Sequence, residues 1–240
     1  MKLVSLKNIS FAYPNGSALL DQLNFELYSG ERVGIIGPNG SGKTTLAHII
    51  MGLIKPRSGQ IEIFGQIIRS EKDFQKIRPR IGFVFQNADD QLIYPTVLED
   101  VAFGPLNLGH SPEKAKELAR AILAKLGLSE FEQRFTHNLS GGEKKLVSIA
   151  TVLVMEPEAL IFDEPTTGLD EQTRRKLIKI IQDLDIAQII ISHDYDFLAQ
   201  TTKKQYLMKQ GKLVYDQSVV MHKHIHVHPL GQIPHKHEEA

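Results

Sequence analysis

The stretch "GPNGSGKT" at residues 37–44 decides which fold we expect for this chain. It fits the pattern G-x-x-x-x-G-K-[ST] and lies between the strand-like run "RVGIIG" and the helix-like run "KTTLAHIIMGL". In such units the backbone N–H groups surround phosphates, Lys43 reaches the β- and γ-phosphates, and Thr44 supplies an oxygen ligand to Mg²⁺. The correct flanking runs argue against a chance glycine-rich turn. We therefore predict a nucleoside triphosphate site at Gly37, Pro38, Asn39, Gly40, Ser41, Gly42, Lys43, Thr44 and Thr45.

Two acids follow a second apolar run, "ALIFDEP" at 159–165. The run is typical of a buried strand, and open α/β sheets hold ligands at the carboxyl ends of their strands. Asp163 suits the coordination shell of Mg²⁺, and Glu164 suits positioning or deprotonating the water that attacks a phosphate. An ordinary acidic turn is the alternative, and the phosphate loop in the same chain favours the catalytic interpretation.

The composition excludes several classes of protein. The chain has 240 residues, 42% of them hydrophobic and 23% charged, which is ordinary for a globular protein. Lys plus Arg equals Asp plus Glu at 28 each, so the charge gives no indication of nucleic-acid binding. Cysteine is absent, which excludes disulfides and thiolate metal sites. There is no signal-peptide core and no apolar run near the roughly 18 residues of a membrane helix, so we expect a cytosolic protein.

Strand-like and helix-like segments alternate along most of the chain. Strands are expected in two N-terminal runs, in a hairpin at 59–68, at "IGFVFQ" and at "QIIIS", and helices after Gly42 and Asp170. This alternation predicts an α/β core with a parallel sheet. We predict a single domain at 1–217 with a helical subdomain inserted at about 87–156. A histidine-rich tail, expected to be flexible, follows at 218–240.

The stretch "LSGGE" at 139–143 predicts a second site for an anion. Ser140 and the backbone N–H groups of Gly141 and Gly142 precede a helical run and would form an outward-facing helix N-terminus. One phosphate loop needs no second anion site unless the nucleotide lies between two chains.

The remaining motifs lead to a family. Gln86 follows "GFVF", "GLD" occupies 168–170, and His193 stands in "IISHD". With the phosphate loop, the signature at 139–143 and the acid pair, they occur in the order found in ATP-binding subunits of ABC transporters. The chain resembles that family from about residue 3 to 215. It departs from the common signature at Glu143, where Gln is usual, which could weaken or retune the anion contact.

The resemblance implies the ABC ATPase fold: an α/β, mixed sheet core with an N-terminal antiparallel β region and a helical subdomain. It implies ATP hydrolysis coupled to transport, with ATP and Mg²⁺ bound. Tyr13 would stack on adenine, and Asp170 would communicate across a dimer. Gln86 would link the Mg²⁺ site to the helical subdomain, and His193 would contact the γ-phosphate. The implied catalytic residues are Lys43, Gln86, Glu164 and His193, and the implied Mg²⁺ ligands are Thr44, Gln86 and Asp163.

The segment "NADDQLIYPTVLEDVAFGPLNLG" at 87–109 narrows the family. It resembles energy-coupling-factor transporter ATPases, especially cobalt or nickel importers, in which it lies near the groove for the membrane subunit. The chain has one complete set of motifs, so two copies paired head to tail could make two complete sites, and a homodimer is the simplest assembly. The resemblance implies a position at the cytoplasmic face of the membrane, with integral membrane partners contacting about residues 86–109. A vitamin importer is the alternative. A soluble ABC ATPase fits less well because it carries two cassettes or a coiled-coil insertion, and a metal-buffering protein leaves the hydrolytic motifs unexplained.

Six of the ten histidines lie in the C-terminal stretch "MHKHIHVHPLGQIPHKH". The first four alternate with other residues, so in an extended chain their imidazoles share one side. Neutral imidazole binds Ni²⁺, Co²⁺, Zn²⁺ and Cu²⁺. An engineered tag and a solvated tail without a metal role are the alternatives. We predict a transition-metal site at His222, His224, His226, His228, His235 and His237.

Overall fold

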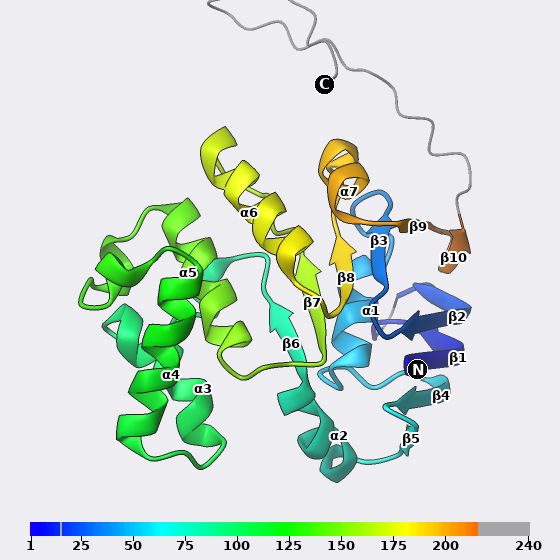
Figure 1. The fold of residues 1–240 in the computed structure, drawn as a ribbon. Coiled ribbons are helices and arrows are strands. Elements are labelled where there is room, and N and C mark those ends of the chain that lie inside the picture. The colour runs from blue at the N-terminus through cyan, green and yellow to red at the C-terminus, as the bar shows by residue number, and fades with distance from the viewer. Residues whose placement is uncertain (15, 216–240) are drawn as a thin grey trace, which may run out of the picture.

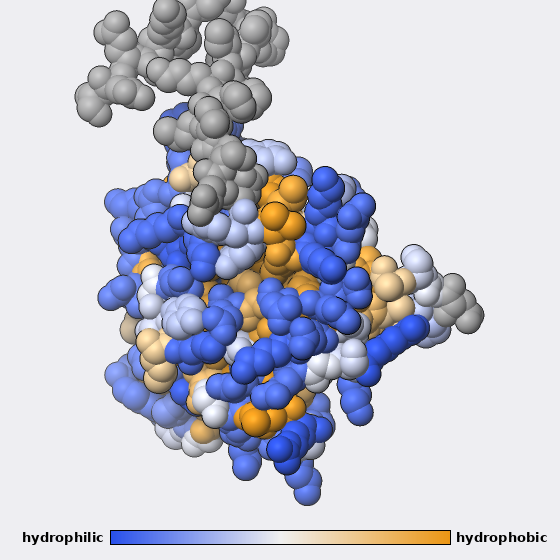
Figure 2. Space-filling view, turned by 90° about the vertical axis from the view of Figure 1, so that its right-hand side faces the viewer, coloured by the Kyte–Doolittle hydropathy of each residue, from blue (hydrophilic) through white to orange (hydrophobic). Residues whose placement is uncertain are grey.

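Alternating apolar side chains place the first strands in an antiparallel sheet of order β2-β1-β4-β5. The computed structural model describes residues 1–14 and 16–215. Along β2, Leu23, Phe25 and Leu27 are buried while the residues between them are more exposed. Figure 2 shows the side of the molecule formed by this region as mostly hydrophilic, as expected for a sheet with one solvated face. The strands are β1 (Lys2–Phe11), β2 (Leu20–Tyr28), β4 (Ser58–Ile63) and β5 (Gln66–Ile68).

A second sheet, of order β10-β9-β3-β8-β7-β6, forms the centre of the fold. Its pairings are parallel except between β10 and β9. Every residue of β7 and β8 is buried, because both faces of the sheet are covered. The strands are β3 (Arg32–Ile36), β6 (Ile81–Val84), β7 (Ala159–Asp163), β8 (Ala187–Ile191), β9 (Lys204–Lys209) and β10 (Lys212–Tyr215).

Helices α3 to α7 form two groups in space (Figure 1). Helices α3, α4 and α5 pack together at the end of the molecule away from the antiparallel sheet, while α6 and α7 lie over the central sheet. The bounds are α1 (Lys43–Ile50), α2 (Glu71–Ile77), α3 (Val97–Asn107), α4 (Pro112–Lys125), α5 (Gly141–Leu153), α6 (Glu171–Asp183) and α7 (Tyr195–Thr201).

The central sheet separates two hydrophobic cores. Successive residues of β7 point to opposite faces, so Ile161 joins the core under α1 and the antiparallel sheet. Leu160 and Phe162 join the core formed with α3 to α7. The antiparallel sheet and α1 therefore pack on one face of the central sheet, and helices α3 to α7 pack on the other.

Parallel pairing brings the carboxyl ends of β3, β6, β7 and β8 to one edge. Ile191 at the end of β8 is in register with Asp163 on β7 and with Ile35 on β3. The segments that leave these four strands carry the phosphate loop, Gln86, the acid pair and His193.

The mixed α/β architecture agrees with the fold class predicted from the sequence. Helix α5 begins at Gly141 and is capped by Ser140, as expected for the helix N-terminus predicted at residues 140–142. Within residues 1–14 and 16–215, no helix has the length and apolarity to cross a membrane. The six histidines of the predicted metal site lie outside the described residues.

Phe162 lies in the core between β7 and the helices, and it is fully buried. Phe162→Ala should lower the free energy of unfolding by about 3–5 kcal/mol, because it leaves a cavity between the sheet and the helices. Urea unfolding followed by circular dichroism measures this change. The control Tyr195→Ala, at a side chain 61% exposed, should change it by less than about 0.5 kcal/mol. Equal losses would contradict the packing described for Phe162.

Candidate functional site

The phosphate loop connects β3 to α1, and its glycines are required by the backbone. Gly40 and Gly42 have φ of 76° and 104°, which strain residues with a side chain. A Cβ on Gly37 would lie 2.7 Å from the carbonyl oxygen of Met208, so this glycine permits a close approach. No side chain caps the N-terminus of α1 and no acid lies in its first turn. The positive end of the helix dipole therefore faces the loop and suits a phosphate.

Lys43 lies beneath this loop and is 6% exposed. Its Nζ donates to the carbonyl oxygens of Gly37 at 2.8 Å and Pro38 at 3.1 Å. These bonds hold the ammonium at the cavity wall, where Lys43 is one of the lining residues. The only charge that the loop itself contributes is thus placed where phosphate oxygens would lie.

Thr44 and Asp163 meet between α1 and β7. The Thr44 hydroxyl donates to Asp163 Oδ1 at 3.2 Å, and Gln86 lines the same cavity. Burial raises the pKa of Asp163, the Thr44 hydrogen bond lowers it, and the Glu164 carboxylate raises it further, so the net direction is upward. A hydroxyl, an amide oxygen and a carboxylate are hard donors that fit Mg²⁺. The cation would also offset the unfavourable burial of the carboxylate.

Glu164 and His193 form a second polar pair at the same edge. His193 Nδ1 lies 2.8 Å from Glu164 Oε2, and the His193 backbone N–H donates to the same oxygen at 3.3 Å. Glu164 has a φ of 44°, a conformation that costs about 1–3 kcal/mol and persists where surrounding contacts impose it. Here the Glu164 N–H donates to the Ile191 carbonyl at 2.9 Å. The carboxylate, 7% exposed, is therefore held in one orientation at the cavity.

An open cavity of about 590 Å³ is lined by the phosphate loop, Glu164 and His193. Asp163 does not line the cavity itself, but is hydrogen-bonded to the lining residue Thr44. Tyr13 stands at its wall, 48% exposed, with its hydroxyl 3.2 Å from Thr45 Oγ1. Its ring packs edge-on against Phe11 at 4.9 Å between centroids, which sets the orientation of the tyrosine. The lining is Tyr13, Leu19, Asn39, Gly40, Ser41, Gly42, Lys43, Thr44, Thr45, Gln86, Glu164, Thr167 and His193.

The signature residues do not line this cavity as the described residues form it. Ser140 caps α5, and its Oγ accepts from the Glu143 N–H at 3.3 Å. Asp170 is also a helix cap, since its side chain accepts from the Thr173 N–H at 2.9 Å and from the Thr173 hydroxyl at 2.7 Å. One chain thus brings together the phosphate loop, Gln86, the acid pair and His193, but leaves Ser140, Gly141, Gly142 and Asp170 apart from them.

Two residues that the sequence analysis did not identify connect Gln86 to α5. Lys145, 2% exposed, donates through Nζ to the carbonyl oxygens of Phe85 at 2.8 Å and Gln86 at 2.7 Å. Burial lowers the pKa of Lys145 to about 8, and Asp163 raises it. Gln91 accepts from the Phe85 N–H at 3.1 Å and donates to the Ser148 carbonyl at 2.7 Å. The contacts with α5 join positions 57 to 60 residues apart, so no local pattern could have indicated them.

The arrangement defines an α/β nucleotide-binding ATPase with a phosphate-binding loop. Comparison with known families identifies the family of this ATPase: the "ABC transporter" family matches residues 20–167. The chain is 50% identical over 236 residues to an ABC transporter ATP-binding protein of Nitratidesulfovibrio vulgaris, covering 98% of this chain and 86% of that protein. It is 44% identical to the energy-coupling factor transporter ATP-binding protein EcfA of Methanothermobacter thermautotrophicus, covering 88% and 70%.

Solved structures agree with these relatives. CbiO1 of Clostridium perfringens, part of the ABC transporter complex CbiONQ, superposes with a TM-score of 0.80 at 35% identity, covering 89% of this chain and 87% of that one. The dimeric bacterial ABC transporter cassette MJ0796 gives a TM-score of 0.80 at 30% identity, covering 88% and 96%. The chain belongs to the ABC transporter ATP-binding proteins, of the energy-coupling-factor type. The predicted family, fold class and ATPase activity coupled to transport are confirmed.

The predicted transition-metal site falls on residues that the structure does not describe. Residues 1–14 and 16–215 contain no group of three or more His, Asp or Glu side chains that could hold a metal ion. The histidines from 222 to 237 lie beyond these ranges, so their metal site stays a prediction.

The Gln91 contacts can be tested through stability. Gln91→Ala leaves the Phe85 N–H without its acceptor, and should lower the free energy of unfolding by about 1–3 kcal/mol. Chemical denaturation measures the loss. Gln133→Ala, at an exposed amide bonded to the Glu132 side chain, should change the value by less than about 0.5 kcal/mol. A Gln91 variant as stable as the Gln133 variant would show that the segment does not depend on this amide.

Proposed function

We propose that this chain hydrolyses ATP to energise a membrane importer for cobalt or nickel ions, working as a nucleotide-sandwich homodimer. The observation that supports the hydrolytic role most directly is the buried Glu164 carboxylate, held by His193 beside the phosphate loop. Similarity of 87–109 to cobalt and nickel importer ATPases favours the metal cargo.

Each residue of the cavity has a role in this proposal. The N–H groups of residues 39–45 and the Lys43 ammonium bind the β- and γ-phosphates, which fixes the γ-phosphate in the site. Glu164 orients the attacking water and accepts its proton, while the exposed His193 ring contacts the γ-phosphate. Tyr13 stacks on the adenine.

Mg²⁺ would be held by Thr44, Asp163 and Gln86, and when bound it neutralises charge on the phosphate oxygens. The chain's own residues prepare this site. Asp163 is kept beside Thr44 by their hydrogen bond, and Gln86 is kept at the cavity by the hydrogen bond from Lys145 to its carbonyl. If Gln86 shifts on nucleotide binding, its hydrogen bond with Lys145 would transmit the shift to α5.

The separation of the signature from the cavity supports a homodimer. Ser140, Gly141 and Gly142 form an anion-suited helix N-terminus that the cavity of their own chain does not use. Asp170 would communicate between the two chains. Head-to-tail pairing of two copies would complete two sites, and the dimeric structure of the similar MJ0796 cassette supports this assembly.

Residues 86–109 are the proposed contact for integral membrane subunits at the cytoplasmic face. Ile93, Leu106 and Leu108 are 66%, 41% and 44% exposed, so this segment offers apolar side chains to a partner. We place this segment in a helical subdomain at about 87–156 of one domain at 1–217. The tail histidines would bind Ni²⁺, Co²⁺ or Zn²⁺, which rests on the sequence alone.

Two substitutions test the hydrolytic roles. Glu164→Gln should lower kcat by about 100-fold or more, because the amide cannot accept the proton of water. It should also leave an ATP-loaded dimer, detectable by size-exclusion chromatography with light scattering.

Lys43→Ala should abolish ATP binding measured with a fluorescent analogue. Glu171→Gln, at an exposed acid on α6, is the control and should keep wild-type kcat. Turnover near wild type in Glu164→Gln would refute its assignment.

Cargo is tested by accumulation of labelled nickel and cobalt in the source cells, with and without this gene. A sharp fall in one ion on deletion is expected, and restoration by wild type but not by Lys43→Ala would tie the fall to ATP binding. Unchanged nickel and cobalt would contradict the metal cargo and favour a vitamin importer, the second candidate for the same ATPase.

A further inference from the structure

Glu143, the acid that departs from the common signature sequence, forms an ion pair with Arg134. Arg134 donates to Glu143 through both terminal nitrogens, at 2.7 Å to Oε1 and 3.2 Å to Oε2. Glu143 Oε2 also accepts from the Ser140 N–H at 2.7 Å. The Arg134 guanidinium and the Ser140 N–H lower the pKa of Glu143, so the pair is ionic at neutral pH. A bidentate pair of this kind is among the stronger polar contacts in proteins.

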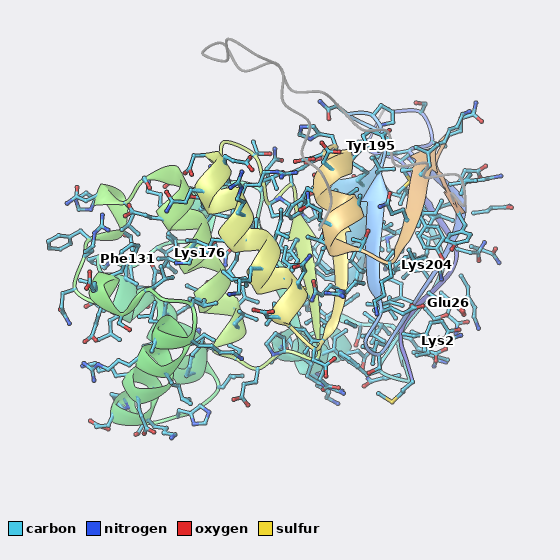
Figure 3. All side chains as sticks on the ribbon, turned by 45° about the horizontal axis from the view of Figure 1, so that its top comes forward. Lys2, Glu26, Phe131, Lys176, Tyr195 and Lys204 are labelled. Carbon is cyan, nitrogen blue, oxygen red and sulfur yellow. The ribbon has the colours of Figure 1, made fainter. Side chains whose placement is uncertain are left out.

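Arg134 is held in place independently of this pair. Its N–H donates to the Phe131 carbonyl at 2.9 Å, and its carbonyl accepts from the Val97 N–H at 3.1 Å. The guanidinium also lies 4.5 Å from the centre of the Phe131 ring. Figure 3 shows Phe131 on the helical side of the molecule, far from Lys2 and Lys204. The backbone therefore presents the guanidinium to the start of α5.

The neighbouring charges have other partners. Glu132 pairs with Arg120 at 2.7 Å, and Lys144 pairs with Asp89 at 2.6 Å. Arg134 is consequently the cation that balances Glu143 in the described part of the chain.

Glu143 has opposite effects on helix stability and on anion binding. A carboxylate in the first turn stabilises α5 through the helix dipole and the Ser140 N–H. The same negative charge repels a phosphate that approaches Gly141 and Gly142. The capping contacts use the N–H groups of Ser140 and Glu143, and leave those of the two glycines to other acceptors.

We propose that Arg134 is a positioning residue of the signature, whose guanidinium neutralises Glu143 so that the start of α5 can accept the triphosphate bound by a second copy of this chain. This inference rests on the proposed nucleotide-sandwich dimer. Arg134 acts through Glu143 and need not touch the nucleotide. The pair keeps the capping advantage of Glu143 and removes its repulsion.

A charge cycle tests the proposal, with ATP-induced dimerisation measured in a Glu164→Gln background by light scattering. Arg134→Gln should weaken dimerisation by about tenfold, which corresponds to 1.4 kcal/mol, because Glu143 is left uncompensated. Glu143→Gln should tighten it by about two- to threefold, since the cation remains near the phosphates. The double variant should return to within about threefold of the parent. Arg120→Gln, which breaks a comparable exposed pair, is the matched control.

Varying the ionic strength distinguishes charge repulsion from a folding defect in Arg134→Gln. The defect of Arg134→Gln should shrink between about 50 and 500 mM salt, because screening weakens the repulsion, whereas a folding defect would persist. A double variant as weak as Arg134→Gln would overturn the proposal and indicate direct contact of Arg134 with the nucleotide. Dimerisation of Arg134→Gln equal to the parent would overturn it as well. If the Glu164→Gln parent forms no ATP-dependent dimer, the proposed function fails instead.

Discussion

The parallel, in-register pairing of β3, β8, β7 and β6 is the constraint on which the site depends. It brings the ends of four strands, separated by more than a hundred residues of sequence, to one edge of one sheet. The pairing also extends beyond the strands, since the Ile191 carbonyl accepts from the Glu164 N–H and helps to impose its positive φ. A shift of one residue in any of these strands would turn its functional side chain toward the opposite face.

Burial of polar groups gives this edge its chemical character. Asp163, Glu164 and Lys43 are each less than 9% exposed, so their charges act through little water. Their cost is offset by specific partners: Thr44 for Asp163, His193 for Glu164 and two loop carbonyls for Lys43. A site arranged in this way needs little reorganisation as charge develops on a phosphate.

Helix α5 connects the carboxyl edge of the central sheet with the signature residues 139–143. Its first turn carries Glu143, which pairs with Arg134. Further along the helix, Lys145 and Ser148 hold the segment of Phe85, Gln86 and Gln91. A rigid helix thus connects the cavity of one chain to the surface that would serve a second chain. The electrostatic balance at Glu143 and the contacts at Gln86 belong to the same element.

The sequence by itself determined the phosphate loop, the acid pair, the order of the motifs and the α/β class, because each depends on residues close together in the chain. The segments α2, α7, β9 and β10 were not predicted, since they are short and their patterns are weak. Only the tertiary structure decided that Lys145 supports Gln86, that Asp170 caps α6, and that Arg134 neutralises Glu143. The physical reason is that a hydrogen bond or ion pair depends on distance in space, and a local sequence pattern does not record which groups folding will bring together.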